Sequence, residues 1–230
     1  MTFGASRSDA SAITPRLTSR DALLFCRYAS DSFKNFNTGA VYRAITCEYK
    51  NLYGSTAPTE QIIKEFVKNL SVKVTFDGDK QIVLANGNDY TAHLRDEEIS
   101  NFVALVSPFD EVRQKVREIQ REFAKTNNCV MEGRDIGTVV LPHAQCKLFI
   151  TASNEVRAMR RLEQLKDTPD CPTYEQLLQE LNDRDFKDIN REHGALLPAK
   201  DGIIIDNSNE TLEQTLARCE KIVREIMAKQ

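Results

Sequence analysis

Acidic and basic side chains recur at helical spacing in the segment LNDRDFKDINREHGALLP. Arg184 precedes Asp188 by four residues and Asp188 precedes Arg191 by three, so a helix would place all three on one face. On many helices such a row is only a solvent-exposed ladder of ion pairs. This segment, however, leads into a loop containing Gly and Pro just before an apolar run, which favours a functional site.

A second basic group lies on the preceding predicted helix and consists of Arg157, Arg160 and Arg161. The link between the two helices contains Pro169 and Pro172. Two arginine-bearing helices joined in this way are typical of a mobile flap that closes on phosphate. Arginine suits this role because its planar guanidinium can donate to two phosphate oxygens at once and does not lose its charge.

Two further motifs combine polar groups with a predicted strand end or helix start. In NTGAVYR (37–43) a hydroxyl and a glycine turn precede a helix that carries Tyr42 and Arg43 in its first turns. Amide groups at a helix start favour anions. In MEGRDIGTVVLP (131–142) an apolar strand runs out through Arg134 and Asp135. Ligands of open α/β sheets bind at the carboxyl ends of the strands, so this position also indicates a site.

The composition excludes several classes of protein. A formal net charge of −3 lacks the basic excess that a broad nucleic-acid surface requires. The six cysteines form no CxxC pair and the three histidines are isolated, so no zinc spacing is present. No apolar run approaches the roughly 20 residues of a membrane span, and the N-terminus lacks a secretory signal core. We expect a cytoplasmic protein with reduced thiols, although Ser, Ala and Arg near the N-terminus faintly suggest a transit peptide.

Apolar runs and amphipathic segments alternate in the second half of the chain. The runs 128–132, 146–151 and 202–207 lack polar alternation, which indicates strands buried on both faces of a parallel sheet. Helices are predicted between and after them, at 153–166, 173–192 and 211–228, the last two with capping boxes. Strands alternating with helices predict an open α/β sheet.

In the first half of the chain, the sequence pattern predicts helices on either side of a small hairpin. A helix is expected from near Thr18, an amphipathic helix at 59–70 and further helices at 97–125 with a break near Pro108. Between them, Val72, Val74 and Phe76 alternate with polar residues, and residues 81–85 are predicted to form the return strand. Asp77-Gly78 supplies the positive φ of a tight hairpin turn.

The motifs NTGAVYRAI, GRDIGTVVLPHAQCKLFITAS, RAMRRLEQL, RDFKDINRE and IIIDNS resemble, in order and spacing, the bacterial-type cytidylate kinases, a family of P-loop nucleoside monophosphate kinases. The resemblance runs from about residue 36 to the C-terminus. It implies a P-loop-kinase-like open parallel sheet flanked by helices, an antiparallel hairpin-bearing insert at about 59–105 and a helical lid at about 157–192. Residues 1–35 form an atypical segment in place of the usual first strand and phosphate loop.

The resemblance implies transfer of a phosphoryl group from ATP to CMP or dCMP, with Mg²⁺, in a monomer that binds small nucleotides. Residues that would bind the acceptor phosphate are Thr38, Tyr42, Arg43, Arg134 and Arg191. Arg113 and Asp135 would recognise cytosine, Arg184 and Asp188 would reach the sugar and help close the site, and Arg160 and Arg161 would act as lid arginines on the transferred group. Where the family usually has a serine against the base, this chain has Ala104.

The family's phosphate loop, GxxxxGK[ST], has no match in this chain. GASRSDASA (4–12) offers Ala10 where the lysine belongs, and gapless alignment brings TPRLTSRDA (14–22) to the loop with Arg20 at the lysine position. The second register lacks the glycines and the magnesium-binding hydroxyl, and side chains at the glycine positions would block amides from surrounding a phosphate. The strand that should precede the loop is expected to be missing too.

Three explanations stay open for residues 1–35. They can derive from a shifted reading frame or a wrong start, which is the simplest explanation because the similarity stops abruptly. The chain can be a degenerate relative that binds CMP without turnover, so a catalytically inactive or vestigial homologue is the alternative function. Or an unusual N-terminus can still bind ATP.

Overall fold

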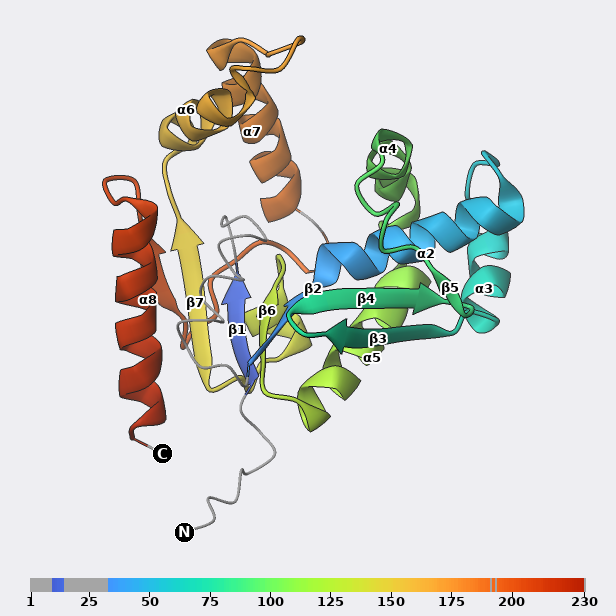
Figure 1. Cartoon of the computed structure of the whole chain (residues 1–230), viewed down its shortest axis with the longest axis horizontal. Coiled ribbons are helices and arrows are strands. Elements are labelled where there is room, and N and C mark those ends of the chain that lie inside the picture. The colour runs from blue at the N-terminus through green and yellow to red at the C-terminus, as the bar shows by residue number, and fades with distance from the viewer. Residues whose placement is uncertain (1–9, 15–32, 191, 193, 230) are drawn as a thin grey trace. The chain divides into compact units, whose positions relative to one another are not determined.

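The structure, a computed structural model, describes residues 10–14, 33–190, 192 and 194–229. These residues form two compact units (Figure 1). The first unit includes residues 33–133, and the second includes residues 11–14 and 134–229. The helix expected from Thr18 lies outside the described residues, as does Arg20.

The first unit combines a parallel strand pair, a small antiparallel sheet and four helices. Strand β2 pairs in parallel with β6, and the hairpin β3–β4 continues into the short β5. The elements are β2 (Lys34–Asn37), α2 (Thr38–Tyr53), α3 (Glu60–Lys68), β3 (Val72–Asp77), β4 (Lys80–Ala85), β5 (Asn88–Asp89), α4 (Glu97–Val106), α5 (Asp110–Thr126) and β6 (Cys129–Glu132).

Aromatic side chains join the layers of this unit. Phe123 of α5 contacts both Phe36 of β2 and Phe76 of β3, with ring centroids 5.1 and 5.5 Å apart. A second cluster surrounds Tyr49 of α2, which meets Phe66 edge-on. Aromatic pairs at these separations add to the stabilisation from burial alone. The hairpin is therefore fixed to the helices and is not a free flap.

The second unit is built on three parallel strands. Strand β7 lies between β1 and β8, pairing in parallel with each. Helix α8 packs beside β7, and α6 and α7 form a helical pair (Figure 1). The elements are β1 (Ala10–Thr14), η1 (Ile136–Val140, one π-helical turn), β7 (Cys146–Thr151), α6 (Asn154–Leu165), α7 (Tyr174–Ile189), β8 (Ile203–Asp206) and α8 (Leu212–Met227).

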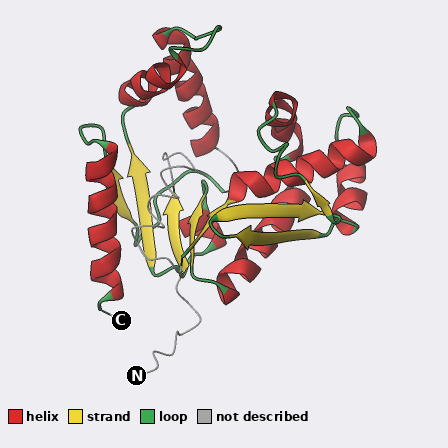
Figure 2. Cartoon of the chain, viewed as in Figure 1, coloured by secondary structure: helices red, strands yellow, loops and turns green. Residues whose placement is uncertain are grey.

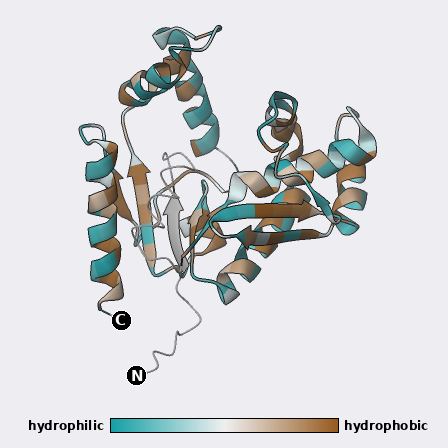
Figure 3. Ribbon diagram, in the orientation of Figure 1, coloured by the Kyte–Doolittle hydropathy of each residue, from teal (hydrophilic) through white to brown (hydrophobic). Residues whose placement is uncertain are grey.

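Local sequence signals account for most element boundaries (Figure 2). Thr173 and Thr211 begin α7 and α8 with the predicted capping boxes. Gly78 has φ +57° in the hairpin turn, as predicted for that position. The α/β class, the parallel strands and the antiparallel hairpin of the insert are confirmed. Figure 3 shows that β7 and part of β4 are apolar, and this apolar character favoured their prediction as strands.

Strand β1 corrects one expectation. The strand before the phosphate loop was expected to be missing, yet Ala10–Thr14 pairs in register with β7, Ser11 opposite Cys146 and Thr14 opposite Phe149. The segment ASAIT is too short for a clear sequence pattern, and the parallel partner supplies the backbone hydrogen bonds that define it. Thr14, the first residue of the segment that the gapless alignment brings to the loop, is thus the last residue of a strand.

Three further expectations differ from the structure. Strand β8 is not buried on both faces: of its isoleucines only Ile205 is buried, since β8 is the last strand of its unit's order. Helix α7 ends at Ile189 rather than at residue 192, because Asn190 caps it. Gly39 forms no separate turn and lies inside the first turn of α2. Within the described part of the chain, no helix is long and apolar enough to cross a membrane.

Candidate functional site

The first turn of α2 is held by side chains from three other elements of its unit, β2, β4 and α5. Asn37 caps the helix by accepting from the Ala40 amide at 3.0 Å. The Gln81 side chain of β4 accepts from the Asn37 amide at 2.6 Å and donates to its carbonyl at 3.2 Å. Gln120 of α5 donates to the Thr38 hydroxyl at 2.8 Å. With its oxygen accepting from Gln120, the Thr38 hydroxyl can direct its own proton to a ligand.

Arg43 folds back over this same turn. A Cβ built on Gly39 would lie 2.9 Å from Arg43 Nη1 and 3.2 Å from Asn37 Oδ1, so a larger residue at this position would have to displace the guanidinium. Long helical side chains lean toward the helix N-terminus, which explains this direction. Among the described residues, no hydrogen-bond partner meets the buried Nε of Arg43.

This arrangement favours an anion. The first turn of α2 contains no acidic residue, so no carboxylate of that turn compensates the positive end of the helix dipole. A guanidinium with an unpartnered buried N–H adds to that positive potential, and leaving such a donor unsatisfied is unfavourable. Bound phosphate oxygens would accept from the guanidinium, the Thr38 hydroxyl and the helix amides.

The other predicted site residues of this unit lie on α2, α4 and α5. Tyr42 is half-buried on α2, and its carbonyl accepts from the Thr46 hydroxyl at 2.8 Å. Arg113 is half-buried in the first turns of α5. Ala104 is exposed on α4 and offers no polar side chain to a base.

In the second unit, Arg134 and Asp188 form an ion pair. The distance from Arg134 Nε to Asp188 Oδ2 is 2.8 Å, and the Asp188 side chain is only 3% exposed while that of Arg134 is 26% exposed. Burial lowers the pKa of the Arg134 guanidinium, and the charge of Arg184 acts in the same direction, while Asp188 opposes both. Two cations close together and only partly compensated would be stabilised by an anion.

A cavity of about 380 Å³ lies beside this ion pair. Its size falls in the range of small-molecule sites. Both carboxylates and cations line the cavity. Carboxylates accept from sugar hydroxyls and cations bind phosphate, so this lining suits a polar, charged ligand. The lining residues are Arg134, Glu180, Asp183, Arg184, Lys187 and Asp188.

Helix α7 brings together two of the three residues predicted to share its face. Arg184 is exposed and its Nε lies 4.0 Å from Asp188 Oδ2, as the spacing of four predicts. Arg191 follows the end of α7 and lies outside the described residues, so its predicted place on this helical face is not described.

The basic group of α6 divides into three different environments. Arg157 pairs with Asp185 of α7, and both side chains are nearly buried, so this pair joins α6 to α7. Arg161 is exposed and donates to Gln164 at 3.3 Å on its own helix. Arg157 therefore serves the packing of α6 on α7, whereas Arg161 remains accessible.

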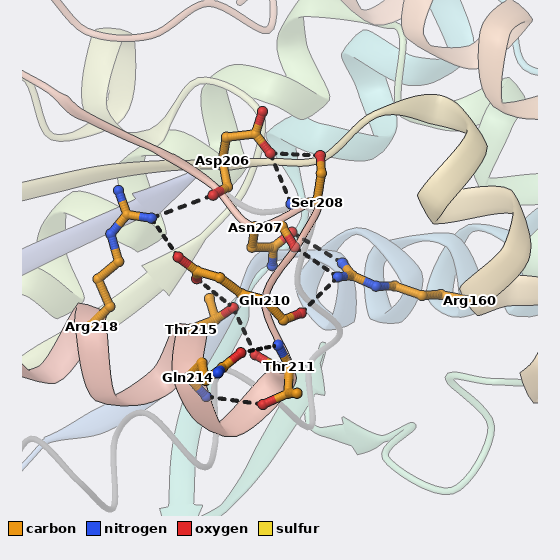
Figure 4. A network of polar contacts seen from close by, with 9 residues as sticks. All are labelled: Arg160, Asp206, Asn207, Ser208, Glu210, Thr211, Gln214, Thr215 and Arg218. Atoms are coloured by element: carbon orange, nitrogen blue, oxygen red, sulfur yellow. Dashed lines mark hydrogen bonds and ion pairs between the residues drawn. The ribbon is translucent and has the colours of Figure 1, made fainter.

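Arg160 binds the loop that follows β8 (Figure 4). Its guanidinium donates to the Asn207 side chain at 3.0 Å, to the Asn207 carbonyl at 2.8 Å and to the Glu210 carbonyl at 3.0 Å. The Glu210 carboxylate in turn accepts from Arg218 of α8 at 2.6 Å. Arg160 thus connects α6 with the start of α8, and its predicted role on the transferred phosphoryl group stays a prediction.

The segment after β6 is fixed by a buried lysine. The Asp135 carbonyl accepts from the Val139 amide at 2.8 Å as the π-helical turn η1 begins. Lys147 of β7 packs its methylenes 3.4 Å from the position of a Cβ on Gly137, and its ammonium donates to the Pro142 carbonyl and to Asp201. This lysine thus holds the backbone at Gly137 and Pro142, in the segment that follows Arg134 and Asp135.

The family implies ATP and Mg²⁺, and the described residues supply no metal centre of their own. Within them, no group of three or more His, Cys, Asp or Glu side chains could hold a metal ion. The segment TPRLTSRDA that follows β1 contains no glycine and no lysine. The roles of the side chains above do not depend on that ion.

Sequence reasoning missed the residues that hold the site residues in place. Gln120 interrupts the buried stripe of α5, whose other members are Val112, Val116 and Ala124. Lys147 is a charge inside an apolar strand, and Gln81 precedes two buried residues on the same face of β4. A polar residue at an otherwise apolar position was the available signal in each case.

Comparison with known proteins identifies the family. The family model for cytidylate kinase matches residues 27–227, so β1 lies outside the matched range. A cytidylate kinase of Caldicellulosiruptor saccharolyticus is 39% identical over 184 residues, covering 80% of this chain and 81% of that protein. One of Clostridium tetani is 38% identical over 206 residues, covering 86% and 87%.

Among solved structures, a dephospho-CoA kinase from Campylobacter jejuni matches with a TM-score of 0.41 and 16% identity, covering 96% of this chain and 98% of that one. The sequence relatives and the family model agree with the motifs and with the α/β fold. The chain belongs to the cytidylate kinase family.

Proposed function

We propose that this protein transfers a phosphoryl group from ATP to CMP or dCMP. The observation that carries the proposal is the first turn of α2, where Thr38 and Arg43 offer unused donors at an uncompensated helix N-terminus. Such a site suits the dianionic phosphate of a nucleoside monophosphate. The curated relatives are named cytidylate kinases, which supports CMP as the acceptor.

The remaining residues are assigned by the family motifs. Tyr42, Arg134 and Arg191 bind the acceptor phosphate together with Thr38 and Arg43, and Arg113 and Asp135 recognise cytosine. Arg184 and Asp188 contact the sugar, which the carboxylate-lined cavity of the second unit supports. Arg160 and Arg161 act on the transferred group.

In this mechanism the side chains position the nucleotides and neutralise their negative charge, and none of them forms a covalent intermediate. ATP supplies the phosphoryl group, and the guanidinium groups offset charge on the acceptor so that its oxygen can approach. Orientation alone can contribute about 7–11 kcal/mol to lowering such a barrier.

A second function is favoured by the segment after β1. Because residues 14–22 lack the glycines and lysine of a phosphate loop, the chain can bind CMP without turnover. Loss of one preorganised oxyanion donor lowers rates by about 10²–10³ in other enzymes, and this segment lacks several such donors.

Two measurements on the purified chain separate these functions. Coupled ADP release with ATP, Mg²⁺ and increasing CMP tests turnover, and calorimetry with CMP, dCMP, UMP and AMP tests binding. Saturable ADP release supports the kinase, whereas CMP binding without ADP release supports the inactive homologue. The proposal fails if CMP does not bind or if AMP binds best.

Variants locate the binding site. Arg43→Met is expected to weaken CMP binding by at least about tenfold, because a charge-assisted phosphate contact is lost. Lys68→Met, which removes an exposed cation from α3 of the same unit, is the matched control and should bind CMP like the parent chain. Equal affinities in both variants would contradict the assignment of Arg43.

A further inference from the structure

The β3–β4 hairpin reaches the first turn of α2 through one side chain, Gln81. Its carboxamide makes two hydrogen bonds to the backbone of Asn37, 44 positions away in sequence, as acceptor at 2.6 Å and donor at 3.2 Å. A bidentate contact of this kind fixes both the position and the rotation of the Asn37 peptide groups. The family motifs assign no role to this glutamine.

The hairpin is a rigid support for that contact. Phe76, which lies opposite Gln81 in the strand register, packs on Phe123 of α5. Lys34 of β2 donates to the Gly78 carbonyl at the hairpin turn, at 3.1 Å. Gln81 shares its face of β4 with Val83 and Ala85, which are both fully buried. The amide is therefore presented from packed structure and not from a loose loop.

Asn37 passes this restraint to Arg43. Its Oδ1 accepts from the Ala40 amide and also borders the space above Gly39, 3.2 Å from the Cβ position. Arg43 Nη1 occupies the same space, 2.9 Å from that Cβ position. A shift or rotation of Asn37 would therefore change both the exposed amides of the first turn and the seat of the guanidinium.

We propose that Gln81 is a positioning residue of the acceptor site: it holds Asn37 so that Thr38, the first-turn amides and Arg43 face the phosphate of a nucleoside monophosphate. The inference rests on the proposed function for the identity of the ligand. Gln81 itself does not touch the ligand. The inserted hairpin thereby serves phosphate recognition.

The test uses the full chain with Gln81→Leu, which removes both hydrogen bonds, and Gln81→Glu, which keeps only the acceptor for the Asn37 amide. Gln61→Leu makes the same chemical change at an exposed position of α3 and is the matched control. Amide hydrogen exchange in the ligand-free proteins reports the restraint directly. Exchange at the Asn37 amide should be at least about tenfold faster in Gln81→Leu and unchanged in Gln61→Leu.

Titrations followed by NMR with CMP and with cytidine report the effect on the phosphate. In Gln81→Leu the dissociation constant for CMP should rise about fivefold to tenfold, whereas that for cytidine, which has no phosphate, should stay within about twofold. Gln81→Glu should lie between the parent chain and Gln81→Leu. If Gln81 served only general stability, its replacement would weaken the binding of CMP and of cytidine to the same extent.

The outcomes separate the inference from the proposed function. Unchanged exchange at Asn37, or equal losses for CMP and cytidine, overturns the role of Gln81. If the parent chain binds neither ligand, the proposed function fails and so does a phosphate role for Gln81, while faster exchange at Asn37 still shows that Gln81 holds the start of α2.

Discussion

The two units hold their candidate phosphate-binding arginines in different ways. Arg43 lies over Gly39, its buried Nε meets no hydrogen-bond partner among the described residues, and packing around the first turn of α2 decides its place. Arg134 is paired with the buried carboxylate of Asp188. A guanidinium held by shape depends on the volume of its neighbours, whereas one held by a carboxylate depends on charge.

The two units also differ in the kind of group that donates to a buried carboxylate. Glu48 of α2 accepts from three neutral donors, Asn86 at 2.9 Å, Asn88 at 3.1 Å and Tyr90 at 2.6 Å. Asp188 accepts instead from the cation of Arg134. Glu48 of the first unit is thus satisfied by dipoles, whereas Asp188 of the second unit is joined to a cation. This contrast predicts which substitutions each unit tolerates.

Removal of Asp188 should produce the largest effect. Asp188→Ala leaves the largely buried Arg134 beside Arg184 without its carboxylate, so we expect a loss of about 3 kcal/mol in the free energy of unfolding. Asp188→Asn retains an acceptor of similar shape and should lose less. Urea unfolding of the parent chain and both variants measures the difference.

Asp170→Ala is the control for that series, because Asp170 is an exposed carboxylate in the link between α6 and α7. It should leave the unfolding free energy within about 0.5 kcal/mol of the parent chain. If Asp188→Ala lost no more than this control, the ion pair would not be what holds Arg134.

Gly39→Ala tests the packing that holds Arg43. Alanine favours a helix over glycine by about 0.5–1 kcal/mol, so stability should change little or rise. The new Cβ, 2.9 Å from Arg43 Nη1, should nevertheless displace the guanidinium and weaken CMP binding about tenfold. Calorimetry with CMP and thermal unfolding of the same variant give the two numbers.

The opposite signs of these two effects make the test specific. A variant that loses stability and CMP affinity together would indicate damage to α2 as a whole. Unchanged CMP affinity would show that Arg43 binds from another position, and the contrast between the two units would then be wrong.

The smallest effect concerns Tyr90 and depends on pH. Burial, followed by the hydrogen bond to Glu48, raises the pKa of Tyr90 to about 12 from its ordinary value of 10.0. The folded chain therefore keeps this proton more tightly than the unfolded chain, so the stabilisation is complete below about pH 10 and declines toward pH 12. Tyr90→Phe lacks this contribution.

The urea midpoints of the parent chain and of Tyr90→Phe should therefore approach each other as the pH rises from about 9 to about 11, because the parent chain progressively loses the contribution of the Tyr90 proton. Other titrating groups are common to both proteins and cancel in the comparison. A difference between the two urea midpoints that stays constant over this range would mean that the hydrogen bond from Tyr90 to Glu48 does not contribute to stability.

Local sequence patterns were sufficient for most elements. The capping boxes at Thr173 and Thr211, the Asp77-Gly78 turn and the apolar run of β7 each contain the interactions that form the element. The spacing of Arg184 and Asp188 likewise predicted their proximity on α7. Family motifs added the assignment to the cytidylate kinases, which the family model and the relatives confirm.

Other features depended on partners distant in the sequence. The strand Ala10–Thr14 follows from pairing with β7, and the exposure of Ile203 and Ile204 follows from the place of β8 at the end of its unit's strand order. Helix α7 ends at Ile189, three residues before its predicted end, where Asn190 caps it. None of these features leaves a reliable periodic signal.

The sequence by itself determined the element types, the family and the residue types available to bind a phosphate, because capping, turn and periodicity signals act over a few neighbouring residues. Only the tertiary structure decided how those residues are held. Gln81 and Gln120 reach Asn37 and Thr38 from positions 44 and 82 residues away, and such contacts form only when packing brings the elements together.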